Sequence, residues 1–137
     1  MKYTLILGGS GFIGANLVRE YIKQDTKVIV FGKINNENTR LSDIKDNLVL
    51  INGSISDIDL LEQIFDEYEI ERVIHLISSL IPSSSKEDFI REHELVIRPT
   101  MELMEVMTKN NVRKLIFISS GGTVYGNYIK SGYYSES

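Results

Sequence analysis

Five short apolar runs alternate along the chain with longer segments that mix apolar and charged residues. Each short run is rich in Val, Ile and Leu and is bounded by Gly, Ser or other polar residues. This pattern is typical of strands that are buried on both faces of a parallel sheet. We therefore predict five strands, all buried on both faces, at residues 3–7, 27–31, 47–51, 72–78 and 114–119.

The longer segments predict helices, because their apolar residues recur every three or four positions. Residues 12–24 and 57–69 each place apolar side chains on one helical face, and Asp57 is suited to cap the second of these helices. A third helical region extends from about residue 86 to residue 110. Pro99 lies inside this region, so we expect a kink or a break there.

The predicted elements follow one another in the order β-α-β-β-α-β-α-β. Buried strands that alternate with helices through right-handed crossovers form a doubly wound parallel sheet. The pattern thus predicts a Rossmann-like α/β fold of about five strands, and 137 residues suit one domain. Ligands of such sheets bind beyond the carboxyl ends of the strands. We expect five segments to converge there: 8–14, 32–33, 53–55, 76–79 and 119–123.

Composition and charge narrow the function classes. A chain that is 42% hydrophobic and 25% charged is typical of a soluble globular protein. The absence of cysteine excludes disulfides and thiolate metal sites, and two histidines are too few to suggest a zinc site. A net charge of −4 argues against a nucleic-acid partner. The apolar run at the N-terminus is too short for a signal peptide or a membrane span, so we expect a cytoplasmic protein with no membrane partner.

The stretch "LGGSGFIG" at residues 7–14 is the strongest candidate for chemistry, because a predicted strand precedes it and a predicted helix follows. Gly8 allows a sharp turn, and Gly11 has no Cβ to block a pyrophosphate from the backbone N–H groups. Gly14 allows the helix to pack close to the sheet, and the helix N-terminus favours an anion. The alternative is an ordinary glycine-rich loop. The context favours a dinucleotide-binding turn.

This stretch resembles the cofactor turn of the extended short-chain dehydrogenase/reductases, the group that contains nucleotide-sugar epimerases and dehydratases. "VIHLIS" and "KLIFISSGGTVYG" continue the resemblance, which covers essentially the whole chain and points to the UDP-glucose 4-epimerase type. The resemblance implies NAD or NADP as cofactor and a reaction that oxidises a sugar hydroxyl transiently. It also implies these cofactor-binding residues: Gly8, Gly11, Phe12, Ile13 and Gly14 in the turn, and Leu76, Ile77 and Ser78 after the fourth strand.

The sequence departs from the family pattern on the adenosine side of the expected site. Lys33 stands near the position of an acid that holds the ribose hydroxyls, so either NADP is favoured or adenosine is bound weakly. Lys33 can equally be a solvated loop lysine. Ser54 replaces an acid that contacts adenine, and it can still form a hydrogen bond with the base. The resemblance implies that Ser54 and the following Ile55 both belong to the cofactor-binding residues. A family lysine and a family asparagine are matched by Leu80 and Val96.

The resemblance assigns the catalytic Ser/Thr to Thr123, with Ser120 as the alternate. His75, in the middle of an apolar strand, is expected to be a satisfied core histidine. The family's Tyr-x-x-x-Lys motif does not occur in the 137 residues, so we expect this chain alone to be inactive. A nucleotide-sugar substrate is then expected only if the missing half is supplied.

Three interpretations of the chain stay open. It is the N-terminal part of a longer enzyme, a stand-alone dinucleotide-binding module, or a degenerate non-catalytic remnant. The intact glycine turn favours the first, and the departures on the adenosine side favour the other two. An exposed sheet edge beside residues 114–119 would also promote self-association into a homo-oligomer.

Overall fold

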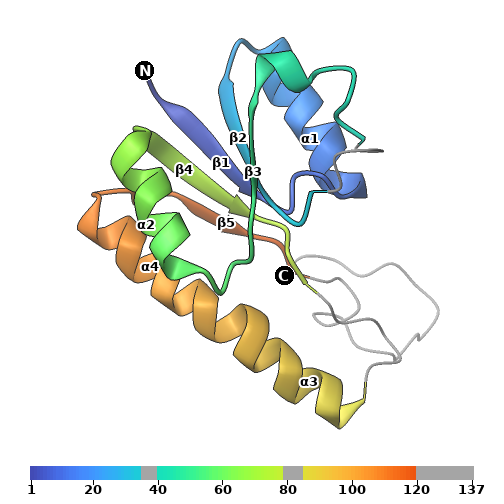
Figure 1. Cartoon of the computed structure of the whole chain (residues 1–137), viewed down its shortest axis with the longest axis vertical. Helices are drawn as coiled ribbons and strands as arrows, with labels where there is room; N and C mark the ends of the chain where they lie inside the picture. Colours follow the sequence, from blue (N-terminus) through green and yellow to red (C-terminus); the bar gives the residue numbers. More distant parts are fainter. Residues whose placement is uncertain (35–39, 79–84, 120–137) are drawn as a thin grey trace, which may run out of the picture.

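The protein is an α/β sandwich built on one parallel five-stranded sheet (Figure 1). The computed structural model describes residues 1–34, 40–78 and 85–119. The strands lie in the order β3-β2-β1-β4-β5, and every described pair is parallel. The predicted Rossmann-like class is therefore confirmed. The strand bounds are β1 Tyr3–Leu7, β2 Lys27–Gly32, β3 Val49–Asn52, β4 Ile70–His75 and β5 Leu115–Phe117.

Helices cover both faces of the sheet (Figure 1). α1 packs on one face, while α2 and α4 pack on the other. Asp57 caps α2 as predicted, because its Oδ1 accepts a hydrogen bond from the Leu60 N–H at 3.1 Å. The helix bounds are α1 Phe12–Lys23, the 3₁₀ turn η1 Lys45–Asn47, α2 Ile58–Glu67, α3 Lys86–Glu92, the π-helix η2 His93–Ile97 and α4 Arg98–Lys109.

Alternate residues of the central strand β1 feed two separate cores. Leu5 and Leu7 pack with the apolar faces of α2 and α4, whereas Ile6 between them packs with Val18 of α1. All three strand residues are fully buried. The alternation follows from the pleat of a strand, which points successive side chains to opposite faces. Burial on both faces fixes β1 at the centre of the sheet.

The long third helical region changes its hydrogen-bonding pattern shortly before Pro99. A five-residue π-helix, His93–Ile97, separates α3 from α4, and Pro99 lies in the first turn of α4. Proline has no backbone N–H, so it fits the first turn of a helix but removes a hydrogen bond further in. The Val96 carbonyl inside the π-helix accepts a hydrogen bond from the Thr100 hydroxyl at 2.6 Å. The expected break is not found, because the chain stays helical from Lys86 to Lys109; the irregularity is a π-helix that ends two residues before Pro99.

The edge strands differ from the prediction. β5 is shorter than expected, and Ile116 and Phe117 are 47% and 46% exposed. β3 is only partly buried along its length. The prediction that all five strands are buried on both faces is therefore wrong for β3 and β5. Each is an edge strand with one described neighbour, so part of its apolar surface remains accessible.

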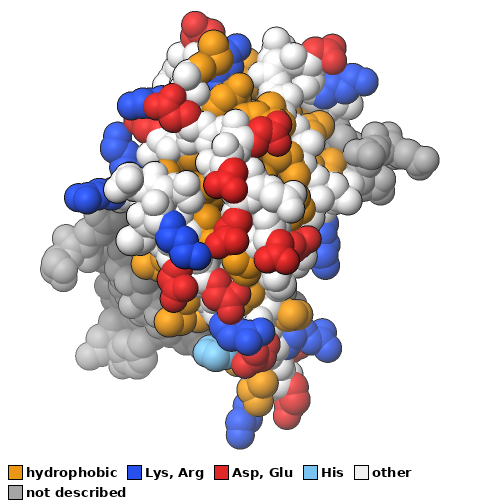
Figure 2. Space-filling model, turned by 60° about the vertical axis from the view of Figure 1, so that its left-hand side comes forward, with side chains coloured by type: hydrophobic (Ala, Val, Ile, Leu, Met, Phe, Trp, Pro, Cys, Tyr) orange, Lys and Arg blue, Asp and Glu red, His pale blue; other side chains and the backbone are white. Residues whose placement is uncertain are grey.

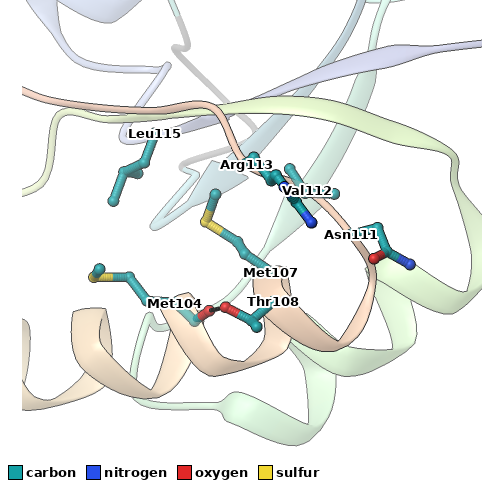
Figure 3. Close-up of a pocket in the computed structure, with 7 residues that line it drawn as sticks. All are labelled: Met104, Met107, Thr108, Asn111, Val112, Arg113 and Leu115. Atoms are coloured by element: carbon teal, nitrogen blue, oxygen red, sulfur yellow. Dashed lines mark hydrogen bonds between the residues drawn. The ribbon is translucent and has the colours of Figure 1, made fainter.

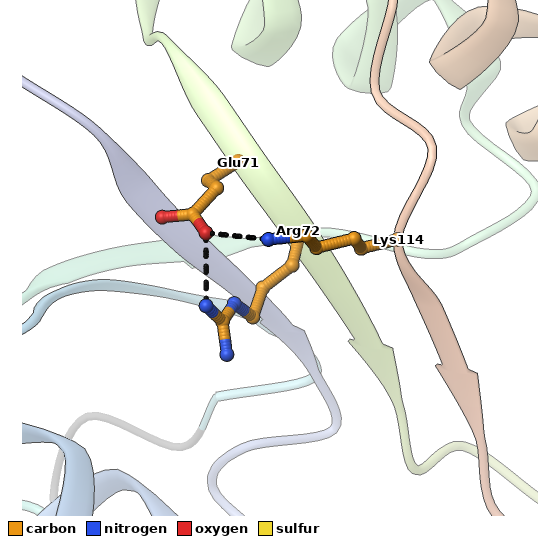
Figure 4. A network of polar contacts seen from close by, with 3 residues as sticks. All are labelled: Glu71, Arg72 and Lys114. Carbon is orange, nitrogen blue, oxygen red and sulfur yellow. Dashed lines mark hydrogen bonds and ion pairs between the residues drawn. The ribbon is translucent and has the colours of Figure 1, made fainter.

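A charged cluster joins β4 to the loop before β5, at the amino ends of the strands (Figure 4). The Glu71 carboxylate accepts hydrogen bonds from the Arg72 guanidinium at 2.9 Å and from the Lys114 ammonium at 3.0 Å. These two contacts, chiefly that with Arg72, lower the pKa of Glu71 to about 2. The cluster lies at the edge of the sheet opposite the glycine turn.

Candidate functional site

The carboxyl ends of the strands meet at one edge of the sheet, as predicted. Leu7, the last residue of β1, is paired with Phe31 of β2 and with His75 of β4. Hydrogen bonds continue past the strand ends: the Gly8 N–H donates to the Phe31 carbonyl at 2.8 Å, and the Leu76 N–H donates to the Leu7 carbonyl at 3.0 Å. The segments that follow β1, β2, β3 and β4 therefore emerge side by side.

The glycine turn has the geometry that its glycines predict. Gly8 adopts a φ of +76°, in the left-handed region that favours glycine. A Cβ at Gly14 would lie 2.5 Å from the Gly8 carbonyl oxygen and 2.6 Å from the Gly9 Cα. The start of α1 is thus in close contact with the backbone of the turn. From the sequence we expected Gly14 to allow close packing of the helix on the sheet. The close contact is instead with Gly8 and Gly9, in the turn that follows β1.

The N-terminus of α1 leaves room for an anion. Gly11 is the N-cap residue, and no side chain caps the helix there. Among the described residues, a Cβ built at Gly11 would have one heavy atom within 4 Å, neighbouring residues aside: the Gly8 carbonyl oxygen at 3.3 Å. The first N–H groups of a helix have no intrahelical acceptor and carry a partial positive charge. The turn therefore fits the pyrophosphate of a dinucleotide. Two apolar side chains beside it are exposed, Phe12 at 74% and Ile13 at 61%.

The segments after β2 and β3 lie next to the turn. The Ser10 hydroxyl donates to the Lys33 carbonyl at 3.4 Å, which brings the exposed Lys33 beside the glycine turn. Asn52 accepts a hydrogen bond from the Ile34 N–H at 2.9 Å and so fixes the chain after Lys33. No sequence pattern indicated this role for Asn52, because the two residues are 18 positions apart.

Ser54 and Ile55 lie in the turn before α2. The Ser54 hydroxyl accepts a hydrogen bond from the Ser56 N–H at 3.3 Å, and its carbonyl accepts one from the Asp57 N–H at 2.9 Å. Ser54 is exposed and faces solvent, whereas the Ile55 side chain is 4% exposed and belongs to the core beneath α2. Their expected contacts with a dinucleotide stay predictions.

The segment after β4 lies directly on the glycine turn. A Cβ built at Gly8 would lie 3.2 Å from the Ile77 Cγ1. Leu76 and Ile77 are half-buried, and Ser78 is exposed. The Ser78 hydroxyl donates to the Glu92 carboxylate at 3.0 Å, and Glu92 is only 5% exposed. Sequence reasoning missed Glu92, because a single acid in a charged helix carries no signal of burial.

His75 is a satisfied core histidine, as predicted. It is 1% exposed, and its ring lies 4.8 Å from that of Phe117. Its Nδ1 accepts a hydrogen bond from the Ile77 N–H at 3.3 Å, and its Nε2 lies 2.9 Å from the Thr100 hydroxyl oxygen. Burial lowers the pKa of His75 to about 4, although the nearby Glu92 carboxylate acts in the opposite direction. The imidazole is neutral at physiological pH.

The depressed pKa of His75 predicts acid sensitivity. Between pH 6.5 and about 4 the unfolded chain binds a proton at this residue and the folded chain does not, so the free energy of unfolding falls as pH falls. The expected slope is up to about 1.4 kcal/mol per pH unit. Urea unfolding between pH 7 and 5 measures it, with His75→Asn as the control that lacks the imidazole. An identical slope in both proteins would contradict this origin.

A pocket of about 410 Å³ lies away from this edge, between the end of α4 and the start of β5 (Figure 3). It is mainly apolar, and the Met104 and Met107 side chains point into it. Acidic side chains are interleaved with exposed apolar ones on the face shown in Figure 2. The pocket does not include any residue of the glycine turn. It is lined by Met104, Met107, Thr108, Asn111, Val112, Arg113 and Leu115.

Two of the five segments expected at this edge lie partly outside the described residues, at position 79 and at 120–123, and so do Leu80, Ser120 and Thr123. The chain that leads to the last two leaves β5 beside the end of β4, because the Ile118 N–H donates to the His75 carbonyl at 3.2 Å. The catalytic assignment of Thr123, with Ser120 as the alternate, stays a prediction. Within the described ranges, no group of three His, Asp or Glu side chains is arranged to hold a metal ion, and no helix is long and apolar enough to cross a bilayer.

Comparison with known proteins gives consistent matches. The chain matches the NAD dependent epimerase/dehydratase family over residues 4–136. It is 32% identical over 127 residues to a putative UDP-glucose 4-epimerase of Methanocaldococcus jannaschii. That alignment covers 91% of this chain and 41% of the relative. The chain thus spans about two-fifths of the length of this relative.

Solved structures of similar proteins share the fold. The UDP-glucose 4-epimerase of Thermotoga maritima, crystallised with UDP-glucose, has a TM-score of 0.78 and 31% identity, covering 94% of this chain and 41% of that one. The dTDP-glucose 4,6-dehydratase of Bacillus anthracis, crystallised in complex with NAD, has a TM-score of 0.79 and 25% identity, covering 99% and 43%.

Proposed function

Because the chain belongs to the NAD-dependent epimerase/dehydratase family, we propose that residues 1–137 form the N-terminal, dinucleotide-binding part of a nucleotide-sugar epimerase or dehydratase. The observation that carries the proposal is the turn between β1 and α1. It combines a left-handed Gly8, open space at Gly11 and an uncapped helix N-terminus. A similar protein of known structure is a complex with NAD, which supports the same ligand class here.

The residues of this chain have separate roles in the proposed site. The N-terminus of α1 and the backbone at Gly11 bind the pyrophosphate, with Phe12 and Ile13 at its border. Lys33 and Ser54 lie on the adenosine side, and the segment 76–78 lies on the nicotinamide side. When bound, the nicotinamide supplies hydride transfer to and from a sugar carbon. The chain's own contribution in the described residues is to bind and orient the dinucleotide.

We propose further that the 137 residues alone bind the dinucleotide without turning over a sugar. The Ser/Thr role falls to Thr123 or Ser120, and the 137 residues contain no Tyr-x-x-x-Lys pair to share the acid/base work. A nucleotide sugar then becomes a substrate only when the rest of such an enzyme is supplied.

A titration with NAD and with NADP tests the proposal. We expect both to bind, and NADP to bind about fivefold more tightly, because an exposed lysine near a 2′-phosphate contributes about 1 kcal/mol. Lys33→Glu should remove or reverse this preference. Lys27→Glu is the matched control, since Lys27 is exposed and begins β2, the strand that ends just before Lys33, at the opposite edge of the sheet.

The outcomes separate the interpretations of the chain. A preference for NADP that Lys33→Glu abolishes and Lys27→Glu retains supports the assigned adenosine side. Binding without any dependence on Lys33 supports the site but contradicts the role of that lysine. Binding of neither dinucleotide at millimolar concentration would overturn the proposal and favour a non-binding remnant of the family.

A further inference from the structure

Three linked hydrogen bonds, two of them buried and one part-buried, join the end of β4 to the π-helix. It runs from the Ile77 N–H to His75, from His75 to the Thr100 hydroxyl, and from that hydroxyl to the Val96 carbonyl. His75, Thr100 and Val96 are 1%, 7% and 4% exposed. Polar groups at such depth are costly unless they are paired. The network therefore connects the π-helix to the segment that lies on the glycine turn.

The direction of each hydrogen bond follows from the last group in the network, the Val96 carbonyl. A carbonyl oxygen only accepts, so the single Thr100 hydroxyl proton is donated to Val96 at 2.6 Å. The Thr100 oxygen must then accept from His75 Nε2, 2.9 Å away, which therefore carries the imidazole proton. In a neutral imidazole the other nitrogen is unprotonated. Thr100 thus sets the tautomer in which His75 Nδ1 can accept the Ile77 N–H.

The segment held in this way is the one that contacts the turn. Ile77 lies against Gly8, and the Leu76 N–H is bonded to Leu7 at the end of β1. The next residue, Ser78, donates its hydroxyl to Glu92, one position before the π-helix. The segment is therefore connected to the helical region of residues 86–109 in two ways: directly, from Ser78 to Glu92, and indirectly, from Ile77 through His75 to Thr100.

We propose that His75 is a positioning residue of the dinucleotide site. Its Nδ1 holds the Ile77 N–H, which keeps the segment 76–78 against the glycine turn, and Thr100 fixes the tautomer that this requires. The inference rests on the proposed function for its effect on affinity. Its structural part, that His75 Nδ1 holds the Ile77 N–H in place, does not depend on any ligand.

Two amide variants separate positioning from packing. The amide of asparagine lies as many bonds from Cα as Nδ1 does, and that of glutamine as many as Nε2 does. His75→Asn therefore keeps an acceptor for the Ile77 N–H, whereas His75→Gln keeps only a group that faces Thr100. Both variants lose the ring contact with Phe117, so both are expected to lower the urea midpoint to a similar degree.

The affinity measurement compares these variants by calorimetric titration with NAD and NADP. We expect His75→Asn to bind within about threefold of the unmodified chain and His75→Gln to bind at least tenfold more weakly. Val106→Ala, a buried position of α4 outside the network, controls for lost stability alone. Equal affinities of the two amide variants, with the unmodified chain binding normally, would overturn the inference.

A second readout needs no ligand. Nitrogen NMR of the imidazole should show protonated Nε2 and unprotonated Nδ1, and Thr100→Val should give a mixture of tautomers. Hydrogen exchange at the Ile77 amide should be slow in the unmodified chain and in His75→Asn, and at least tenfold faster in His75→Gln. If neither dinucleotide binds the unmodified chain, the proposed function fails, and this exchange rate alone decides whether His75 holds the segment. Equal exchange in both variants would refute the hold.

Discussion

Replacing Gly14 with alanine is expected to lower the free energy of unfolding by more than about 3 kcal/mol, beyond the usual cost of an added methyl group. The new Cβ would lie 2.5 Å from the Gly8 carbonyl oxygen and 2.6 Å from the Gly9 Cα. Both contacts are to backbone, which has no alternative rotamer. The Gly8 carbonyl is also the acceptor of the Gly11 N–H, at 3.1 Å, so the turn cannot move without losing this bond. Urea unfolding followed by circular dichroism measures the loss.

Gly11→Ala is the matched control, because it adds the same methyl group to the same turn. There, within the part of the chain that the structure describes, the Cβ would meet only the Gly8 carbonyl oxygen, at 3.3 Å, and Gly11 is exposed. Its backbone is extended, a conformation that alanine adopts freely. We expect a change within about 1 kcal/mol, the scale of an N-cap preference. A similar loss in both variants would show that the contact at Gly14 is not what makes its glycine necessary.

The sequence allowed the fold to be predicted where local patterns decide the structure. The apolar run before Gly8 and the helical period after Gly11 define β1 and α1, because strands and helices differ in the spacing of their buried residues. Asp57 and Pro99 acted as local signals in the same way, one as a cap and the other as a marker of the irregular helical stretch before it. Each of these effects depends on residues within about four positions of one another.

The rest of the site depends on contacts between distant residues. His75 and Thr100 are 25 positions apart, and Ser78 and Glu92 are 14 apart, so no periodic pattern links either pair. The Thr100 hydroxyl donates to the Val96 carbonyl inside a π-helix, whose position is not encoded in a simple repeat. The strand β5 was predicted, but its exposure was not, since its composition resembles that of a central strand although it lies at an edge.

Gly11→Val is expected to weaken dinucleotide affinity at least a hundredfold while leaving the fold intact, which is a loss of about 2.7 kcal/mol of binding free energy. The open space at Gly11 is where the proposed pyrophosphate approaches the N–H groups of α1, and a branched side chain would occupy it. The same titration with NAD and NADP measures the loss, with the urea midpoint as the check on folding.

Gly11→Ala and Gly14→Ala complete the comparison. Gly11→Ala should lose part of the affinity, because a single methyl group fills less of the space above the first turn than an isopropyl group does. Gly14→Ala should lose affinity only in proportion to the folded fraction that remains. Unchanged affinity in a well-folded Gly11→Val would place the dinucleotide elsewhere and remove the main support of the proposed function. A graded loss from alanine to valine, with stability unchanged, is the result that only a site at this helix N-terminus explains.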